Sequence, residues 1–210
     1  MLVVYEEYVA GDGAGTVVPS ESGASRTSPR RAVSAPQGSR TTRLYSTKAR
    51  TIESEPEGGA VEDTIRFYSV SAEYGCFSNF SPHPIRMKGK NWPTSEHYFQ
   101  AQKFAGTPDE EEVRQAKSPM VAARMGRSRK RPLRKDWESV KDSLMYEAVL
   151  AKFSQHAELR ETLLATGDST IVEHTTNDAY WGDGGDGSGQ NRLGETLMRV
   201  RELLRQSEQG

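Results

Sequence analysis

The feature that most limits how this chain can fold is its first segment, which carries no hydrophobic pattern. Residues 10 to 62 are dominated by Gly, Ser, Thr, Pro, Ala and Arg, and apolar residues do not repeat there at the spacing of a strand or a helix. Such a segment cannot bury enough apolar surface to offset the entropy lost on ordering. We therefore predict a disordered tail over residues 1–62 and one folded domain over residues 63–210.

The tail has a second interpretation, as a targeting segment. Ser22 to Thr51 holds seven basic residues and no acidic one, and "RLYS", residues 43–46, is similar to a mitochondrial processing site. Against this, the chain starts "MLVVYEEYVAGDG", with three acidic residues and no basic amphipathic helix. No apolar run approaches the roughly 18 residues that a membrane span requires. We expect a soluble, cytoplasmic protein, with a mitochondrial location as the alternative.

The remaining residues predict an α+β domain that is mostly α-helical, with a small β-sheet. Residues 65–70 and 170–174 have the alternation and the β-branched residues of strands. Residues 84–92 are typical of a hairpin that turns at Lys88 and Gly89. We see neither an alternation of strands and helices typical of βαβ units nor an internal repeat.

Helix signals follow one another along the rest of the domain. Thr107 precedes Pro108 and stands three residues before Glu110, which is the spacing of a capping box. The final helix is expected to begin near Asn191. Its apolar stripe at helical spacing is Leu193, Leu197, Val200 and Leu204. The other residues predicted to cap a helix are Thr94, Ser118 and Asp136.

The stretch "WPTSEHYFQAQKF", residues 92–104, combines aromatic and charged residues on one predicted helix. Glu96, Gln100 and Lys103 stand at i, i+4 and i+7, which places them on one face. A buried Glu close to a Lys has a tunable pKa, which acid–base or electrostatic catalysis requires. The alternative is an ordinary solvated helix face.

The stretch "NDAYWGDGGDGSGQNRLG", residues 177–194, is too rich in glycine for a helix and too aromatic for a linker. Tyr180 and Trp181 offer flat faces for stacking a base, and Asp178 is a candidate carboxylate beside them. The N-terminus of the helix that follows favours an anion such as phosphate. The alternative is a surface turn in which Trp181 fills the core.

Residues 124–135, "RMGRSRKRPLRK", hold seven basic residues and no acidic one. This run is either a solvated loop or a contact for phosphate or nucleic acid. The formal charge of the whole chain is −1, so there is no global nucleic-acid signature.

We expect no cofactor and no metal ion. The single cysteine, Cys76, excludes an internal disulfide and a cysteine-rich zinc site, and it fits a reducing compartment. The four histidines do not have the spacing of metal ligands. A minor alternative is Mg²⁺ held through water by Asp178, Asp183 and Asp186.

Several of these stretches together resemble one family. "YGCFSNF", "WPTSEHYFQAQKF", "GRSRKRPLRKDWESVKDSLM", "AKFSQH", "LLATGDSTIVEHTTNDAYWGDG" and "GQNRLGETLMRVREL" occur in the order seen in the YbiA-like, or NADAR, family. The resemblance runs from about Ile65 to Leu204. It implies a mostly helical α+β domain and N-glycosidase chemistry, in which the C–N bond between a ribose carbon and a base is broken.

The resemblance also implies a site that holds a phosphorylated ribose and a nitrogenous ring. Cleavage builds positive charge on the ribose, which a carboxylate stabilises. We expect Glu96 to be the main carboxylate and Asp178 the second, with Lys103 as a positioning cation or, alternatively, a covalent amine nucleophile. The residues expected to bind substrate are Asn79, Tyr98, Arg127, Arg131, Trp137 and Trp181.

Three functions remain open on the sequence alone. The first is hydrolysis of phosphoribosylated aminopyrimidine intermediates of riboflavin synthesis, and the second is removal of ADP-ribose from guanine in nucleic acid or nucleotides. The third is a non-catalytic module that binds NAD or ADP-ribose. A carboxylate paired with a lysine on one helix favours an enzyme, and the neutral charge of the domain favours a small substrate. The oligomeric state cannot be read from the sequence.

Overall fold

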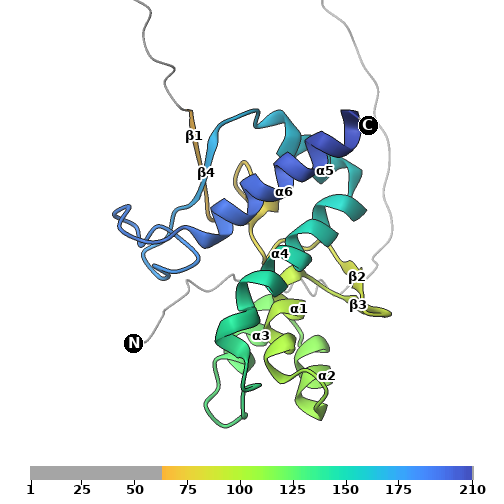
Figure 1. Ribbon diagram of the computed structural model, residues 1–210. Coiled ribbons are helices and arrows are strands. Elements are labelled where there is room, and N and C mark those ends of the chain that lie inside the picture. Colours follow the sequence, from red (N-terminus) through yellow and green to blue (C-terminus); the bar gives the residue numbers. More distant parts are fainter. Residues whose placement is uncertain (1–62, 210) are drawn as a thin grey trace, which may run out of the picture. The chain divides into compact units, whose positions relative to one another are not determined.

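The structure is a computed structural model that describes residues 63–209 (Figure 1). Its fold is α+β and mostly helical, with two small two-stranded sheets, as the sequence predicts. The predicted disordered tail and the processing site at residues 43–46 lie outside the described residues. The elements in chain order are β1 (Thr64–Phe67), η1 (Gly75–Phe77), β2 (Ile85–Met87), β3 (Lys90–Trp92), α1 (Ser95–Ala101), η2 (Gln102–Phe104), α2 (Pro108–Arg114), α3 (Pro119–Gly126), α4 (Trp137–Gln155), α5 (Ala157–Ala165), β4 (Thr170–Glu173) and α6 (Arg192–Gln209).

The strand that opens the domain pairs with the strand that precedes its last helix. β1 and β4 are parallel, in a register that runs from Thr64 opposite Thr170 to Phe67 opposite Glu173 (Figure 1). Both strands are predicted from the sequence, although β1 ends three residues earlier than expected. Their pairing is not, because the chain between them carries α1 to α5 and no local pattern links the two.

The second sheet is the predicted hairpin. β2 and β3 pair antiparallel, and the turn residues Lys88 and Gly89 both have positive φ values, of 50° and 72°. Two successive positive φ angles are what a two-residue type I′ turn requires. The turn prediction is therefore confirmed.

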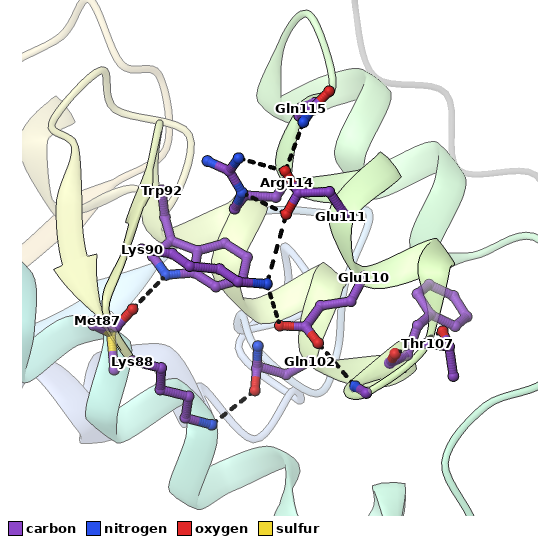
Figure 2. Close-up of polar contacts among 12 residues, drawn as sticks. Met87, Lys88, Lys90, Trp92, Gln102, Thr107, Glu110, Glu111, Arg114 and Gln115 are labelled. Carbon is purple, nitrogen blue, oxygen red and sulfur yellow. Dashed lines mark hydrogen bonds and ion pairs between the residues drawn. The ribbon is translucent and has the colours of Figure 1, made fainter.

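Polar side chains attach this hairpin to the helices that follow it (Figure 2). Lys88 Nζ donates to Gln102 Oε1 at 2.8 Å, and Lys90 Nζ lies 3.5 Å from Glu110 Oε1 and 3.6 Å from Glu111 Oε2. Within the hairpin, Trp92 Nε1 donates to the Met87 carbonyl oxygen at 3.1 Å. The loop that leads into α1 therefore begins from an anchored strand.

The predicted helix starts are mostly right. The hydroxyls of Thr94 and Ser118 accept from the third amide of α1 and α3, as expected for N-caps. The capping box at Thr107 is wrong: its hydroxyl donates back to the Phe104 carbonyl oxygen, and the Glu110 carboxylate instead accepts from the Gly106 N–H. Asp136 precedes α4 as predicted, but its carboxylate binds Arg134 rather than capping the helix.

The core lies where α4 crosses its neighbours. α4 packs against α1, α5, α6 and β2, and α6 packs against α4, α5 and β4 (Figure 1). All four residues of the predicted α6 stripe are buried, which confirms that face. Every residue of α1 is buried as well, including Glu96, His97 and Gln100. Burial of charged and amide side chains is costly unless they are paired, and Glu96 and Gln100 of this helix line the site described below.

Gly194 is required where α6 meets β4. A Cβ atom at this position would lie 2.1 Å from the Ile171 carbonyl oxygen, which belongs to the strand backbone. We expect Gly194→Ala to lower the free energy of unfolding by about 1–3 kcal/mol, because the helix and the strand must move apart.

Urea unfolding measures this loss, and Glu202→Ala on the exposed side of the same helix is the matched control. Glu202 makes surface contacts with Arg205 and Gln206, so its removal should change stability by less than about 0.5 kcal/mol. Equal stability of Gly194→Ala and the wild type would show that the contact between α6 and β4 is looser than described.

Candidate active site

A cavity of about 250 Å³ collects most of the residues predicted to be functional. It is lined by side chains from the loop after β1, the turn after η1, α1, η2, the end of α3, α4, β4 and the loop before α6. Six of the nine predicted site residues lie on its wall. They are Asn79, Glu96, Lys103, Arg127, Asp178 and Trp181.

Glu96 and Gln100 line the cavity from one face of α1. Gln100 Nε2 donates to Glu96 Oε1 at 2.8 Å, within the buried helix. The chain then tightens into the 3₁₀ turn η2, which leaves Lys103 on the same wall. The predicted face at i, i+4 and i+7 is therefore confirmed as a wall of the cavity rather than a solvated surface.

Burial shifts the pKa values of Glu96 and Lys103 in the directions that favour their uncharged forms. Burial raises the pKa of Glu96, while the Gln100 amide and the charges of Lys103 and Arg127 act in the opposite direction. Burial lowers the pKa of Lys103 to about 8, and the Glu96 carboxylate limits that fall. Lys103 Nζ also donates to the Gly126 carbonyl oxygen at 3.2 Å. Both shifts favour the uncharged forms, and such tuned groups are what acid–base chemistry requires.

The side chain of Asp178 is held in place by the backbone of its own loop. Its Oδ1 atom accepts from the amides of Tyr180 and Trp181, both at 2.8 Å. This turn directs Trp181 onto the cavity wall, where its indole meets the Phe99 ring edge-to-face at 5.3 Å between centroids. Tyr180 lies elsewhere, with its hydroxyl donating to Asp142 on α4 at 2.7 Å.

The turn that carries Asn79 is fixed by a buried lysine. Lys152 of α4 is 1% exposed, and its Nζ atom donates to the Ser78 carbonyl oxygen at 2.9 Å and to Ser81 Oγ at 2.6 Å. Burial lowers the pKa of Lys152 to about 7. The Asn79 carbonyl oxygen accepts from the Glu96 amide at 3.1 Å, so this turn and the start of α1 form one unit.

Three predicted site residues do not line the cavity. Tyr98 belongs to α1 and is fully buried, and its hydroxyl donates to Glu147 of α4 at 3.0 Å. Trp137 packs behind Phe99, at 5.1 Å between ring centroids. Arg131 is held by α2, where its guanidinium forms ion pairs with two carboxylates. These placements follow from packing and ion pairing between elements, which a motif cannot reveal.

The expected anion site at the N-terminus of α6 is also wrong. The amides of residues 190, 191, 192 and 193 donate to the carbonyl oxygens of residues 179, 182, 180 and 181. The loop thus folds back onto the start of the helix and occupies these donors itself, so they do not face a ligand.

The sequence interpretation missed Glu173, the last residue of β4. It lies on the cavity wall beside Asp178. Burial and, after it, the charges of Asp178, Glu96 and Asp183 together raise the pKa of Glu173 to about 8. A charged residue that ends an otherwise apolar strand was the available signal.

The aspartates of the loop before α6 are hydrogen-bonded within the protein. Asp183 accepts from His174 at 2.7 Å and from the amides of Thr175 and Gly185, and Asp186 accepts from Ser188. Across residues 63–209, His, Cys, Asp and Glu do not form a group of three or more that could hold a metal ion. Among the helices of that same range, none is long and apolar enough to cross a membrane.

Comparison with known proteins identifies the family of this domain. A family model described as the NADAR domain matches residues 66–205. The chain belongs to the NADAR family. This NADAR protein is 63% identical over 145 residues to the protein named N-glycosidase YbiA of Escherichia coli (strain K12), a match that covers 69% of this chain and 91% of that one.

Two further comparisons agree with the NADAR assignment. The chain is 43% identical over 146 residues to the riboflavin biosynthesis protein VVA0006 of Vibrio vulnificus (strain YJ016), covering 70% of this chain and 40% of that protein. The NMR structure of YbiA from E. coli superposes with a TM-score of 0.66 at 61% identity, over 70% of this chain and 88% of that one.

Proposed function

We propose that this chain hydrolyses the C–N bond between ribose and base in phosphoribosylated aminopyrimidine intermediates of riboflavin biosynthesis, and so removes reactive intermediates. Relatives at 63% and 51% identity are both named N-glycosidases, and the chain is an enzyme of that class. The relative at 43% identity that is named a riboflavin biosynthesis protein supports this substrate class.

The observation that carries the proposal is that carboxylates and cations line the same cavity. The carboxylates Glu96, Asp178 and Glu173 line it together with the cations Lys103 and Arg127. Glu96 is close enough to both kinds of group for the charges of Lys103, Arg127 and Asp178 all to act on its pKa. A phosphorylated ribose has the matching division: an anionic phosphate and a carbon that becomes positive as the base leaves.

Each carboxylate has the environment that its part of the reaction needs. Asp178 is fixed in position by two backbone amides, which suits it to lie beside the positive charge that develops on the ribose. Glu96 has a raised pKa, which suits it to accept a proton from the attacking water.

The other groups bind the two ends of the substrate. Lys103 and Arg127 would hold the 5′-phosphate, in place of Arg131, which α2 already neutralises. Trp181 and Phe99 present aromatic surface for the base. Asn79 would hydrogen-bond a ribose hydroxyl or a ring amide.

The nucleic-acid alternative receives less support from the basic run at 124–135. Arg131 is paired with Asp109 and Glu112, and Arg134 with Asp136, so part of the charge of the run is neutralised within the protein.

Release of the ribose product should therefore be measured side by side on two substrates. One is the 5-amino-6-ribosylaminopyrimidine 5′-phosphate, and the other is an oligonucleotide that carries ADP-ribosyl guanine.

Release from the first substrate alone is the expected result. Release from the oligonucleotide alone would replace the proposed substrate with ADP-ribosylated guanine. Release from neither, with ADP-ribose still bound, would make the chain a binding module.

Two exposed residues of the run provide a further check. Neutralising Arg129 and Lys130 with serine should leave turnover of the aminopyrimidine within about twofold, because screened surface charges contribute little. If nucleic acid is also a substrate, its turnover should fall far more and lose part of its salt dependence. Equal losses of turnover on both substrates would exclude a role for residues 124–135 as a nucleic-acid contact.

A further inference from the structure

The proposed reaction leaves one step without a residue, which is protonation of the departing base. As the C–N bond breaks, its electron pair moves to the nitrogen, and that nitrogen must gain a proton to leave as a neutral amine. Asp178 is proposed to lie beside the charge that develops on the ribose, and Glu96 to accept a proton from water. Both carboxylates already have a part in the proposed reaction, so the departing base needs another proton donor.

Glu173 lies on the wall of the same cavity. The charges that act most strongly on it are those of three carboxylates, Asp178, Glu96 and Asp183. Like charges around a half-buried carboxyl group favour its neutral form. Among the ion pairs formed by residues 63–209, none includes Glu173.

The backbone of Glu173 is held on both sides, which gives its side chain a fixed origin. Its amide donates to Asn191 Oδ1 at 3.0 Å, and its carbonyl oxygen accepts from the Asp183 amide at 2.9 Å. β4 also pairs with β1 up to Phe67, which lies opposite Glu173. A group that transfers a proton must be positioned in this way.

We propose that Glu173 is the general acid of this enzyme, and that it donates its proton to the nitrogen of the departing base. This role rests on the proposed function. Water adds to the ribose carbon, one of its protons passes to Glu96, and the proton on Glu173 moves to the base, so the sum of the step is hydrolysis. Two carboxylates thus take different roles: the charges of Lys103 and Arg127 act on Glu96, whereas those that act on Glu173 belong to carboxylates.

The test begins with Glu173→Gln and Glu173→Asp. The glutamine keeps the size and the neutral state but has no proton to give, so kcat should fall roughly 10²–10⁴-fold while KM stays within about threefold. The aspartate keeps an acidic proton and should retain more activity than the glutamine. A kcat within about tenfold of wild type for Glu173→Gln would overturn the proposal.

The pH profile separates this role from a structural one. Other titratable and charged groups that face or flank Glu173 are Glu96, Asp178, Asp183, Lys103, Arg127, His174 and Arg66. Lys103 also titrates near pH 8, so the comparison is made in the Lys103→Arg background, since arginine stays charged throughout this range. Lys103→Arg should lose activity above about pH 8, where Glu173 loses its proton, and the double variant with Glu173→Gln should not. The same alkaline loss in both would contradict the proposal.

A stability measurement reports on the proton without any substrate. The pKa of Glu173 rises from its ordinary value of 4.5 to about 8 on folding, so between these values the folded chain holds a proton that the unfolded chain releases. Stability from this group is present at low pH and is lost as the pH rises through 8. The melting temperature of Glu173→Gln, relative to wild type, should therefore increase from about pH 5 to about pH 9.

An unchanged difference in melting temperature would show that Glu173 is ionised throughout, and the general-acid role would fail. Absence of turnover by the wild type on either substrate would instead overturn the proposed function, and the melting comparison would still stand. The two failures are thus distinguishable.

Discussion

Glu96→Gln is expected to lower turnover of the aminopyrimidine substrate roughly 10²–10⁴-fold. Glutamine keeps an oxygen that can accept from Gln100, so the buried start of α1 should remain folded. The substitution removes one negative charge from the cavity. It also removes the carboxylate that takes a proton from the attacking water. Because these groups act in the transition state, binding of ribose 5-phosphate should stay within about threefold of wild type.

Product release measures turnover in this experiment, and calorimetry with ribose 5-phosphate measures binding. Glu161→Gln is the matched control, because Glu161 is exposed on α5 and does not line the cavity. It should turn over like wild type. Turnover of Glu96→Gln within about tenfold of wild type would mean that another carboxylate performs this step.

The second large effect is expected at Lys103. Lys103→Met removes a cation that lies on the cavity wall and lowers the pKa of Glu96. Glu96 should then hold a proton to higher pH, and the phosphate should lose a partner. We expect kcat/KM to fall roughly 100-fold, the size of a lost charge-assisted hydrogen bond of about 2–3 kcal/mol.

Lys103→Arg distinguishes the two roles that the sequence left open. Arginine restores the charge but has no amine that could attack a sugar carbon. Recovery of at least about a tenth of the wild-type kcat/KM is expected for a positioning cation. No recovery, together with a substrate adduct on Lys103 that borohydride traps in the wild type, would favour the covalent role.

The sequence predicted best what depends on neighbouring residues. The N-caps Thr94 and Ser118, the turn at Lys88 and the stripe of α6 are local patterns with local causes, and each was found where expected. The shared wall of Glu96 and Lys103 followed from helical spacing in the same way.

What the sequence did not predict depends on which distant segments meet. Arg131 was assigned to phosphate, but Asp109 and Glu112 on α2 neutralise it. Trp137 was expected to bind substrate, but it packs against Phe99 and does not line the cavity. Glu173 was overlooked, because its importance depends on carboxylates brought to it by other elements.

The pairing of β1 with β4 ties the catalytic cavity to the very start of the domain. β4 ends at Glu173, and the strand that supports it along its whole length is Thr64–Phe67. A protease that cut before Thr64 would leave this pair intact. A cut a few residues later would remove the partner of the strand that presents Glu173, although every residue that lines the cavity would still be in the chain. The shortest active form of this enzyme is therefore set by a strand that contributes no side chain to its chemistry.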